Sequence, residues 1–242
     1  MKATIATEYR VRNHVIVRAL RAGIRQFVAL SPDLPPLRLA HELLPAGAGC
    51  RALYLLDDNE PAVWTRIVTT HSLTPDVAWL SSTPGIEQCL RTGHGIGAIN
   101  LNRPLCVLGS TALRHTHDPH ALLAGLWNIL PSGSRVAVNQ VLPLASDTPA
   151  ETGHPPACNV FQRHTRTPLI LRTAPELDAL FMSPHPWDLT AAGPAQTHDT
   201  HDRGSSPSTA DSSSALITRV AVRPPRTRPH GLVSAYRSTP TS

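Results

Sequence analysis

The run 113–120 (LRHTHDPH) is the part of the chain richest in side chains that could transfer a proton or bind a metal ion. His115 could act as a general base, because the pKa of a free histidine lies near neutrality. More often, however, such a histidine is a surface loop residue. His117, Asp118 and His120 add further metal-ligand types, but a metal site also needs defined geometry and supporting hydrogen bonds around the ligands. We therefore predict no metal site here.

A second group of polar residues, 57–60 (DDNE), follows the apolar run 51–56. A carboxylate in this place could accept hydrogen bonds from two neighbouring hydroxyl groups of a ligand, a two-point contact that neutral side chains copy poorly. Asp57 and Asp58 are both candidates. The alternative is a solvated acidic cluster that caps a helix beginning at Pro61 and favours its dipole. Both interpretations stay open at this point.

The glycines of the run 93–97 (GHGIG) resemble a dinucleotide-binding loop only superficially. Such a loop follows a strand and opens a helix, whereas this run precedes the predicted strand 105–109. We interpret it as a flexible connection.

In the sequence before and between these polar runs, predicted strands alternate with predicted helices. Apolar runs predict strands, helical spacing and proline or glycine boundaries predict helices, and the strand–helix alternation predicts a mostly parallel sheet covered on both faces. Right-handed crossovers then give a doubly wound, Rossmann-like α/β fold. The predicted strands are 24–30, 51–56, 77–80, 105–109, 135–142 and 167–172, and the predicted helices are 8–22, 37–44, 61–70, 84–91, 119–129 and 174–181.

The amino-acid composition changes towards the C-terminal part of the sequence. From Ala191 onward Gly, Pro, Ser, Thr, His and Asp dominate, and such a composition offers little apolar surface to offset the entropy of ordering. We expect one domain over 1–185 and a low-complexity, disordered tail over 191–242, which contains a possible short strand at 216–222.

Composition narrows the class of protein. The net charge of +5 is spread along the 242 residues, which argues against a nucleic-acid binder. The four cysteines form no CxxC pair and are expected to be free thiols. There is no signal-peptide pattern, and no apolar stretch approaches the ~18 residues of a membrane span. We expect a cytoplasmic protein that does not contact the membrane, and the sequence leaves its oligomeric state open.

Five stretches, taken together, resemble a bacterial S-adenosyl methyltransferase family that is common in actinomycetes. Their order and spacing carry the resemblance, which runs from about Asn13 to Phe181. It implies a class I methyltransferase fold with S-adenosyl-L-methionine bound across the carboxyl ends of the first three strands. The stretches are AGIRQFVALSPDLPP (22–36), DDNEPAV (57–63), NRPLCVLGSTALRHTHD (102–118), LPSGSRVAVNQ (130–140) and TPLILRTAPELDALF (167–181).

The resemblance implies a set of cofactor-binding residues in this chain. Asp58, or Asp57 if one residue is inserted, matches the acid that would bind the ribose. Ser81 stands where the family has an acid facing the adenine amino group, and the neighbouring Trp79 could stack on adenine or belong to the core. His115 lies in the loop that would face the methyl acceptor.

The loop after the first strand departs most from the family. Members have an acid and two glycines there, which let the backbone approach the cofactor. Here Ala29 replaces the acid, and Ser31 and Asp33 replace the glycines. Ser31, Asp33 and Leu34 could still line a cofactor pocket. The alternative is an ordinary strand-to-helix loop from which cofactor binding has been lost.

These observations define the functions that we consider. The first is an S-adenosylmethionine-dependent methyltransferase with a degenerate cofactor loop and an unidentified methyl acceptor. The second is a catalytically inactive, methyltransferase-like binding or regulatory module. A third, weaker hypothesis is a nucleic-acid-associated protein that uses the arginines of the C-terminal part, Arg219, Arg223, Arg226 and Arg228.

Overall fold

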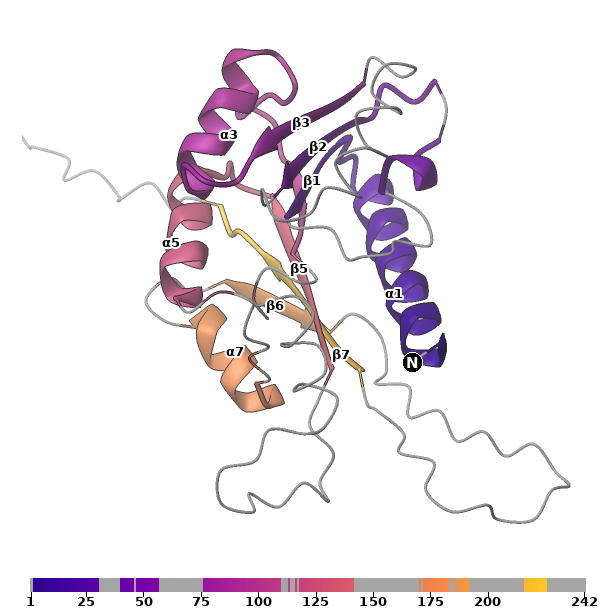
Figure 1. Ribbon diagram of the computed structural model, residues 1–242, viewed down its shortest axis with the longest axis vertical. Helices are drawn as coiled ribbons and strands as arrows, with labels where there is room; N and C mark the ends of the chain where they lie inside the picture. Colours follow the sequence, from indigo (N-terminus) through magenta and orange to yellow (C-terminus); the bar gives the residue numbers. More distant parts are fainter. Residues whose placement is uncertain are drawn as a thin grey trace, which may run out of the picture.

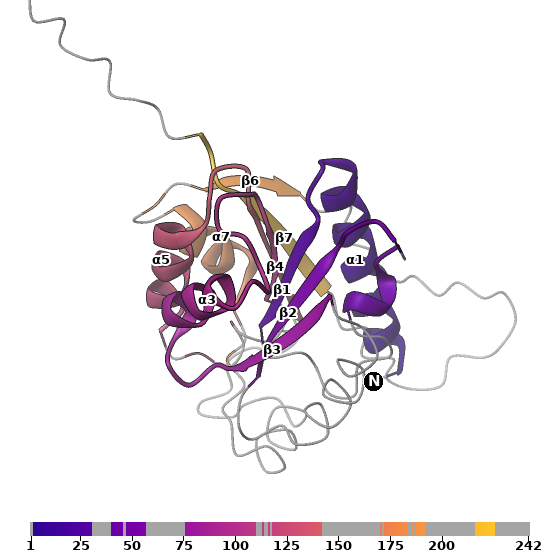
Figure 2. The ribbon, with the colours of Figure 1, turned by 90° about the horizontal axis from the view of Figure 1, so that it is seen from above.

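The computed structural model has three layers, with one mixed sheet between two layers of helices (Figures 1 and 2). Helix α1 (Lys2–Arg21) covers one face of the sheet. Helices α3 (Ile86–Gly95), α5 (Pro119–Ile129) and α7 (Ala174–Met182) cover the other. The structure describes residues 2–30, 40–45, 47–56, 76–109, 113, 116, 118–141, 170, 172–182, 185, 187–191 and 216–225.

Among the described residues, seven strands form the sheet, in the order β3-β2-β1-β4-β5-β7-β6. Strands β1 to β5 pair in parallel, and β7 pairs antiparallel with both β5 and β6. The doubly wound, mostly parallel sheet expected from the sequence is therefore confirmed. The strands are β1 (Gln26–Leu30), β2 (Arg51–Leu56), β3 (Val77–Ser81), β4 (Cys106–Leu108), β5 (Arg135–Val141), β6 (Asp188–Ala191) and β7 (Leu216–Val222).

Central strands are apolar on both sides because both faces of the sheet are covered. All five residues of β1 are buried, as are the last five of β2. Their side chains alternate between two hydrophobic clusters, so Val28 and Leu53 lie on the side of α3, α5 and α7, whereas Phe27 and Tyr54 lie on the side of α1.

Helix α1 ends where the sequence predicts, but it begins earlier, at Lys2 rather than Glu8. Gly23 follows with a φ of 82°, a left-handed conformation that favours glycine. Val15, Ile16 and Ala19 form the buried stripe that packs on the sheet.

Two glycines bring helices unusually close to their neighbours. A Cβ at Gly93 in α3 would lie 2.7 Å from Leu53 Cδ2 in β2, and a Cβ at Gly125 in α5 would lie 2.8 Å from Ile86 Cγ2 in α3. Our interpretation of 93–97 as a flexible connection is therefore wrong for Gly93 and Gly95, because both belong to α3. Gly93 is there because a larger residue would push the helix off the sheet.

Other elements also differ from the sequence-based predictions. The helix expected over 37–44 is a single 3-10 turn, η1 (Ala40–Leu43), in its described part. Ile170 and Arg172, the described residues of the predicted strand 167–172, lie outside any strand. Strand β6 has no counterpart among the predictions, whereas β7 occupies the predicted range 216–222. The helix predicted at 61–70 lies outside the described residues.

The sheet extends beyond residue 185, where we expected the domain to end, because β6 and β7 complete it. Strand β7 pairs with β5 along seven residues, from Arg135↔Val222 to Val141↔Leu216. After β7, the buried Arg223 lies with its guanidinium carbon 5.2 Å from the ring centre of Trp127 in α5. The segment around 216–223 is thus part of the core of the fold.

Candidate functional site

The candidate site lies at the sheet edge where the parallel strands end. Leu30, the last residue of β1, pairs with Leu55, and Leu56, the last residue of β2, pairs with Ser81 of β3. The three strands therefore end within about one residue of each other. Ser31 and Asp57, the residues that come next in the chain, follow directly from neighbouring strand ends.

Strand β4 ends on the other side of β1. Gly109 donates its N–H to Ala137 O at 2.8 Å, and a Cβ at this glycine would lie 3.8 Å from Leu30 Cδ1. From β1, the next two strands, β2 and β3, are added on one side in the sheet, whereas β4 and β5 are added on the other side. Such a reversal opens a crevice outside the strand ends, and this is where open α/β sheets bind ligands.

Ser81 is the one predicted site residue that the structure describes. It is half-buried at the end of β3, and its Oγ lies 2.9 Å from Thr83 Oγ1 and accepts the Thr83 N–H at 3.3 Å. Its carbonyl accepts the Cys89 thiol at 3.2 Å, which ties the strand end to α3. The end of β3 thus carries two hydroxyl groups held together, and a hydroxyl can both donate and accept a hydrogen bond.

Trp79 belongs to the core rather than standing free at the strand end. It is half-buried and packs against the hydrophobic cluster on the α1 side of the sheet. Of the two interpretations that the sequence leaves open, the structure favours the core residue.

The remaining predicted cofactor residues lie outside the described residues: Ser31, Asp33, Leu34, Asp57 and Asp58. After the segment 31–39, which includes Ser31, Asp33 and Leu34, the described residues continue with η1, whose His41 contacts Tyr54 of β2. His41 donates its backbone N–H to Tyr54 Oη at 3.0 Å, and its Nδ1 lies 2.8 Å from the same oxygen. Tyr54 is fully buried, and this burial raises the pKa of its phenol, so the hydroxyl stays neutral. The described residues on either side of 31–39 thus contact the sheet, Leu30 as the end of β1 and His41 through Tyr54.

His115 also lies outside the described residues, but Leu113, Thr116 and Asp118 of the loop after β4 are described. Leu113 is buried in the core, and Asp118 accepts the Ala121 N–H at 2.8 Å and so caps α5. Asp118, one of the four metal-ligand candidates, thus has a structural role as the N-cap of α5. Within the described part of the chain, no three His, Cys, Asp or Glu side chains gather in a way that could hold a metal ion.

Arg172 contacts this loop, and sequence reasoning gave it no role. Its Nη1 donates to Leu113 O and its Nη2 donates to Thr116 O at 3.4 Å. The burial of the guanidinium lowers its pKa, an effect that the nearby Glu176 opposes. The sequence does contain one readable signal beside it. The run Thr173-Ala-Pro-Glu176 has the spacing of a capping box, which marks the start of a helix.

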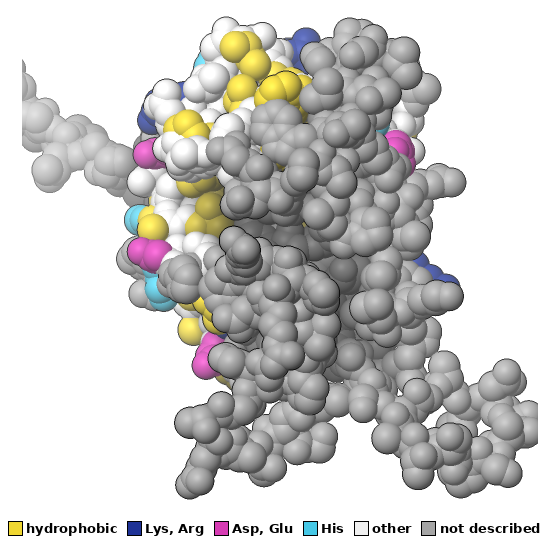
Figure 3. All heavy atoms as spheres, viewed as in Figure 1, with side chains coloured by type: hydrophobic (Ala, Val, Ile, Leu, Met, Phe, Trp, Pro, Cys, Tyr) yellow, Lys and Arg dark blue, Asp and Glu magenta, His cyan; other side chains and the backbone are white. Residues whose placement is uncertain are grey.

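Two of the arginines offered for nucleic-acid binding have structural partners. Arg219 forms an ion pair with Asp178, and Arg223 is buried against Trp127. On the face drawn in Figure 3, the described Lys and Arg side chains lie at separate places. Arg226 and Arg228 lie outside the described residues. Among the helices that the structure describes, none is long and apolar enough to cross a membrane.

Comparisons with known proteins agree with this geometry. The sequence profile of a family described as S-adenosyl methyltransferase matches residues 2–224. A DUF574 family protein from Streptomyces avermitilis is 25% identical, with a TM-score of 0.58 over 88% of this chain and 81% of that one. No curated protein sequence matches this chain.

Two further solved structures share the fold. A candidate methyltransferase from Thermobifida fusca is 18% identical, with a TM-score of 0.62 over 89% of this chain and 81% of that one. Human N-acetylserotonin methyltransferase, solved with S-adenosylmethionine, is 13% identical, with a TM-score of 0.51 over 93% of this chain and 55% of that one. The profile match over nearly the whole chain shows that this protein belongs to the S-adenosyl methyltransferase family, and the strand order, which changes direction between β1 and β4, agrees with it.

Proposed function

We propose that this protein binds S-adenosyl-L-methionine at the sheet edge where β1, β2 and β3 end and transfers its methyl group to a small or macromolecular acceptor. One observation carries the proposal. The parallel neighbours β1 and β2 have their carboxyl ends within about one residue of each other, and the strand order of the sheet changes direction next to them, between β1 and β4. Leu30 and Leu56, after which the segments 31–34 and 57–58 follow in the chain, therefore lie at the same edge of the sheet, and a shared cofactor site there would be built from the two segments.

The described residues fit such a cofactor at the end of β3. The hydroxyls of Ser81 and Thr83 lie together next to the end of β2, and hydroxyl groups can bond an adenine amino group or a ring nitrogen. Asp58, or Asp57, would accept the hydrogen bonds of the ribose hydroxyls, and Ser31, Asp33 and Leu34 would line the methionine end.

The cofactor would supply an electrophilic methyl group on a sulfonium centre, so the protein has little covalent chemistry to perform. Its contribution is to bind the acceptor in line with that methyl group, since proximity and orientation account for much of the rate in such transfers. His115, in the loop after β4, would take the proton of the acceptor nucleophile. A neutral imidazole is suited to this step near neutral pH.

Calorimetric titration with S-adenosylhomocysteine tests the cofactor site without knowledge of the acceptor. We expect the wild-type protein to bind, and either Asp58→Asn or Asp57→Asn to weaken binding about 10-fold or more, because a charge-assisted pair of hydrogen bonds is lost. The matched control is Glu87→Gln, which removes a carboxylate from the exposed face of α3. A wild-type protein that gives no heat with near-millimolar ligand would overturn the proposal.

His115→Gln separates the two halves of the site. We expect it to leave the affinity for S-adenosylhomocysteine within about two-fold of wild type, because its role is directed at the acceptor rather than at the cofactor. A loss of cofactor affinity equal to that of the Asp58 variant would remove the general-base assignment.

A further inference from the structure

The loop after β4 is anchored at both ends. It begins at Gly109, whose N–H bonds Ala137 O, and it ends at Asp118, whose side chain caps α5. Between these points the side chain of Leu113 is buried in the core. The backbone around Leu113 and Thr116 contains the carbonyl groups that Arg172 contacts.

Arg172 reaches this loop from a distant part of the chain, 59 residues from Leu113 and 56 from Thr116. Its planar guanidinium presents several N–H groups in a fixed fork, so one side chain can hold two carbonyl groups that differ in position. A lysine in the same place would be a point charge on a flexible stem and could not fix both carbonyl groups in the same geometry.

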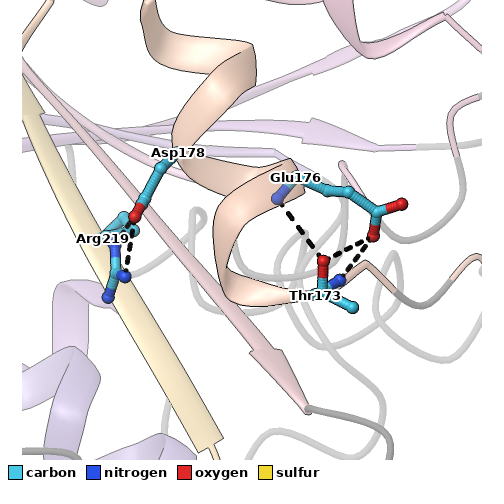
Figure 4. Close-up of polar contacts among 4 residues, drawn as sticks. All are labelled: Thr173, Glu176, Asp178 and Arg219. Atoms are coloured by element: carbon cyan, nitrogen blue, oxygen red, sulfur yellow. Dashed lines mark hydrogen bonds and ion pairs between the residues drawn. The ribbon is translucent and has the colours of Figure 1, made fainter.

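The start of α7 is fixed immediately after Arg172. Thr173 donates its N–H to Glu176 Oε2 at 2.7 Å and its hydroxyl to the same oxygen at 2.8 Å, and Glu176 N–H donates to Thr173 Oγ1 at 3.4 Å. Figure 4 shows this reciprocal arrangement at the first turn of the helix. The capping box fixes the backbone from which the arginine extends.

Helix α7 is in turn fixed to the sheet. Its residues Leu177 and Phe181 are fully buried in the core. Asp178, also on α7, pairs with Arg219 of β7 (Figure 4). Arg172 thus extends from a rigid support rather than from a loose segment. A charged group on a rigid support is well suited to hold a loop in one conformation.

The loop begins at Gly109, beside Leu30 of β1, which is the edge of the sheet where the proposed cofactor site lies. We propose that Arg172 is a positioning residue: its guanidinium fixes the backbone at Leu113 and Thr116, and thereby sets how the loop after β4 faces the ligands bound in the crevice. The part of this inference that concerns ligands rests on the proposed methyltransferase function. The part that concerns the loop rests only on the contacts described above.

Hydrogen exchange of the full-length protein tests the loop directly. In Arg172→Ala, we expect amides of the segment 109–118 to exchange about 10-fold faster or more, since hydrogen bonds to a charged group are lost. Amides of β1 and β2 should be unchanged. The matched control is Arg91→Ala on α3, whose side chain is 63% exposed and forms a weak ion pair with Glu87. Unchanged exchange in 109–118 would overturn the inference.

Chemical rescue distinguishes positioning from general loss of structure. Millimolar guanidinium should slow the exchange of the 109–118 amides in Arg172→Ala, whereas methylammonium, which lacks the fork, should do so less. Arg172→Lys serves if the alanine variant does not fold, and it should show an intermediate exchange rate. Equal effects of the two cations on Arg172→Ala, or wild-type exchange in Arg172→Lys, would count against a role for the fork.

The affinity for S-adenosylhomocysteine tests the connection to the site. We expect Arg172→Ala to bind several-fold more weakly than Arg91→Ala, with recovery in guanidinium. If the wild-type protein does not bind, the proposed function fails while the exchange results still decide the role of Arg172. If the wild-type protein binds and Arg172→Ala binds equally well, the loop does not affect the cofactor side and the inference is wrong in that part.

Discussion

Asp178 of α7 and Arg219 of β7 form a two-point ion pair, in which Nε faces Oδ1 and Nη2 donates to Oδ2 at 3.0 Å (Figure 4). The side chains are 38% and 22% exposed, so the pair is partly removed from water. Two parallel hydrogen bonds between a guanidinium and a carboxylate fix orientation as well as distance. This contact joins α7, the last helix among the described residues, to the strand that lies between β5 and β6.

We expect Asp178→Asn to lower the free energy of unfolding by about 1–2 kcal/mol, because it leaves the Arg219 charge half-buried without its partner. Urea denaturation followed by circular dichroism measures the change. The control is Glu87→Gln, which breaks a 3.8 Å pair between side chains that are 63% and 44% exposed. Exposed pairs of this kind contribute less than about 0.5 kcal/mol. A loss no larger for Asp178→Asn than for the control would contradict the prediction.

Gly93→Ala should destabilise the protein by about 1–3 kcal/mol, because the new methyl group would press against Leu53 and separate α3 from β2. Its Cβ would lie 2.7 Å from Leu53 Cδ2. Gly95→Ala is the matched control in the same helix, since no heavy atom lies within 4 Å of its Cβ position. There the change should be neutral or stabilising by up to about 1 kcal/mol. Thermal denaturation of both variants checks the contrast, and a stable Gly93→Ala protein would show that the packing is looser than described.

Glu176 gives the stability of the protein a defined pH dependence. Hydrogen bonds from the Thr173 N–H and hydroxyl hold its pKa below the ordinary value of 4.5. A carboxyl group with a lowered pKa in the folded state stabilises the fold above its ordinary pKa, and that stabilisation is lost as pH falls through the folded value. In Glu176→Gln, the free energy of unfolding should fall less steeply below about pH 4.5 than in the wild type. Urea denaturation over a pH series measures the slopes, and parallel curves would exclude the effect.

The resemblance to the family implies that Asp33 stands where its members have a glycine, next to the expected place of the cofactor carboxylate. We expect Asp33→Gly to tighten the binding of S-adenosylhomocysteine several-fold, because it removes a like charge and restores backbone freedom. Asp33→Asn removes the charge alone and separates the two contributions. Calorimetry gives the affinities. Weaker binding in both variants would mean instead that the Asp33 carboxylate contributes to holding the ligand.

Much of the sheet could be predicted because its strands are short apolar runs. Strands β2 and β7 have the predicted bounds, and helix α5 spans the predicted residues Pro119–Ile129. The parallel arrangement then follows from the alternation of strands and helices. These features are local in sequence, and local patterns are what a single sequence shows best.

The features that were missed depend on contacts between distant residues. Strand β6 (DLTA) has no apolar run, and its place in the sheet comes from pairing with β7. Gly93 lies inside α3, where a side chain would clash with Leu53 of β2, and this contact is not visible in the local sequence. In the site, the level ends of β1 and β2 could be anticipated from the fold class. The contact of Arg172 with the loop after β4 could not, because no local pattern relates side chains so far apart in the chain.

The position of β7 has a consequence for how the protein is made. Residues 216–222 leave the ribosome after the other described strands, yet they form the only described neighbour of β6 and the second neighbour of β5. Until they arrive, the growing chain presents the edge of β5 to the cell, and unpaired strand edges invite association with other chains. A nascent chain stalled before residue 216 should therefore depend on chaperones more than the finished protein does.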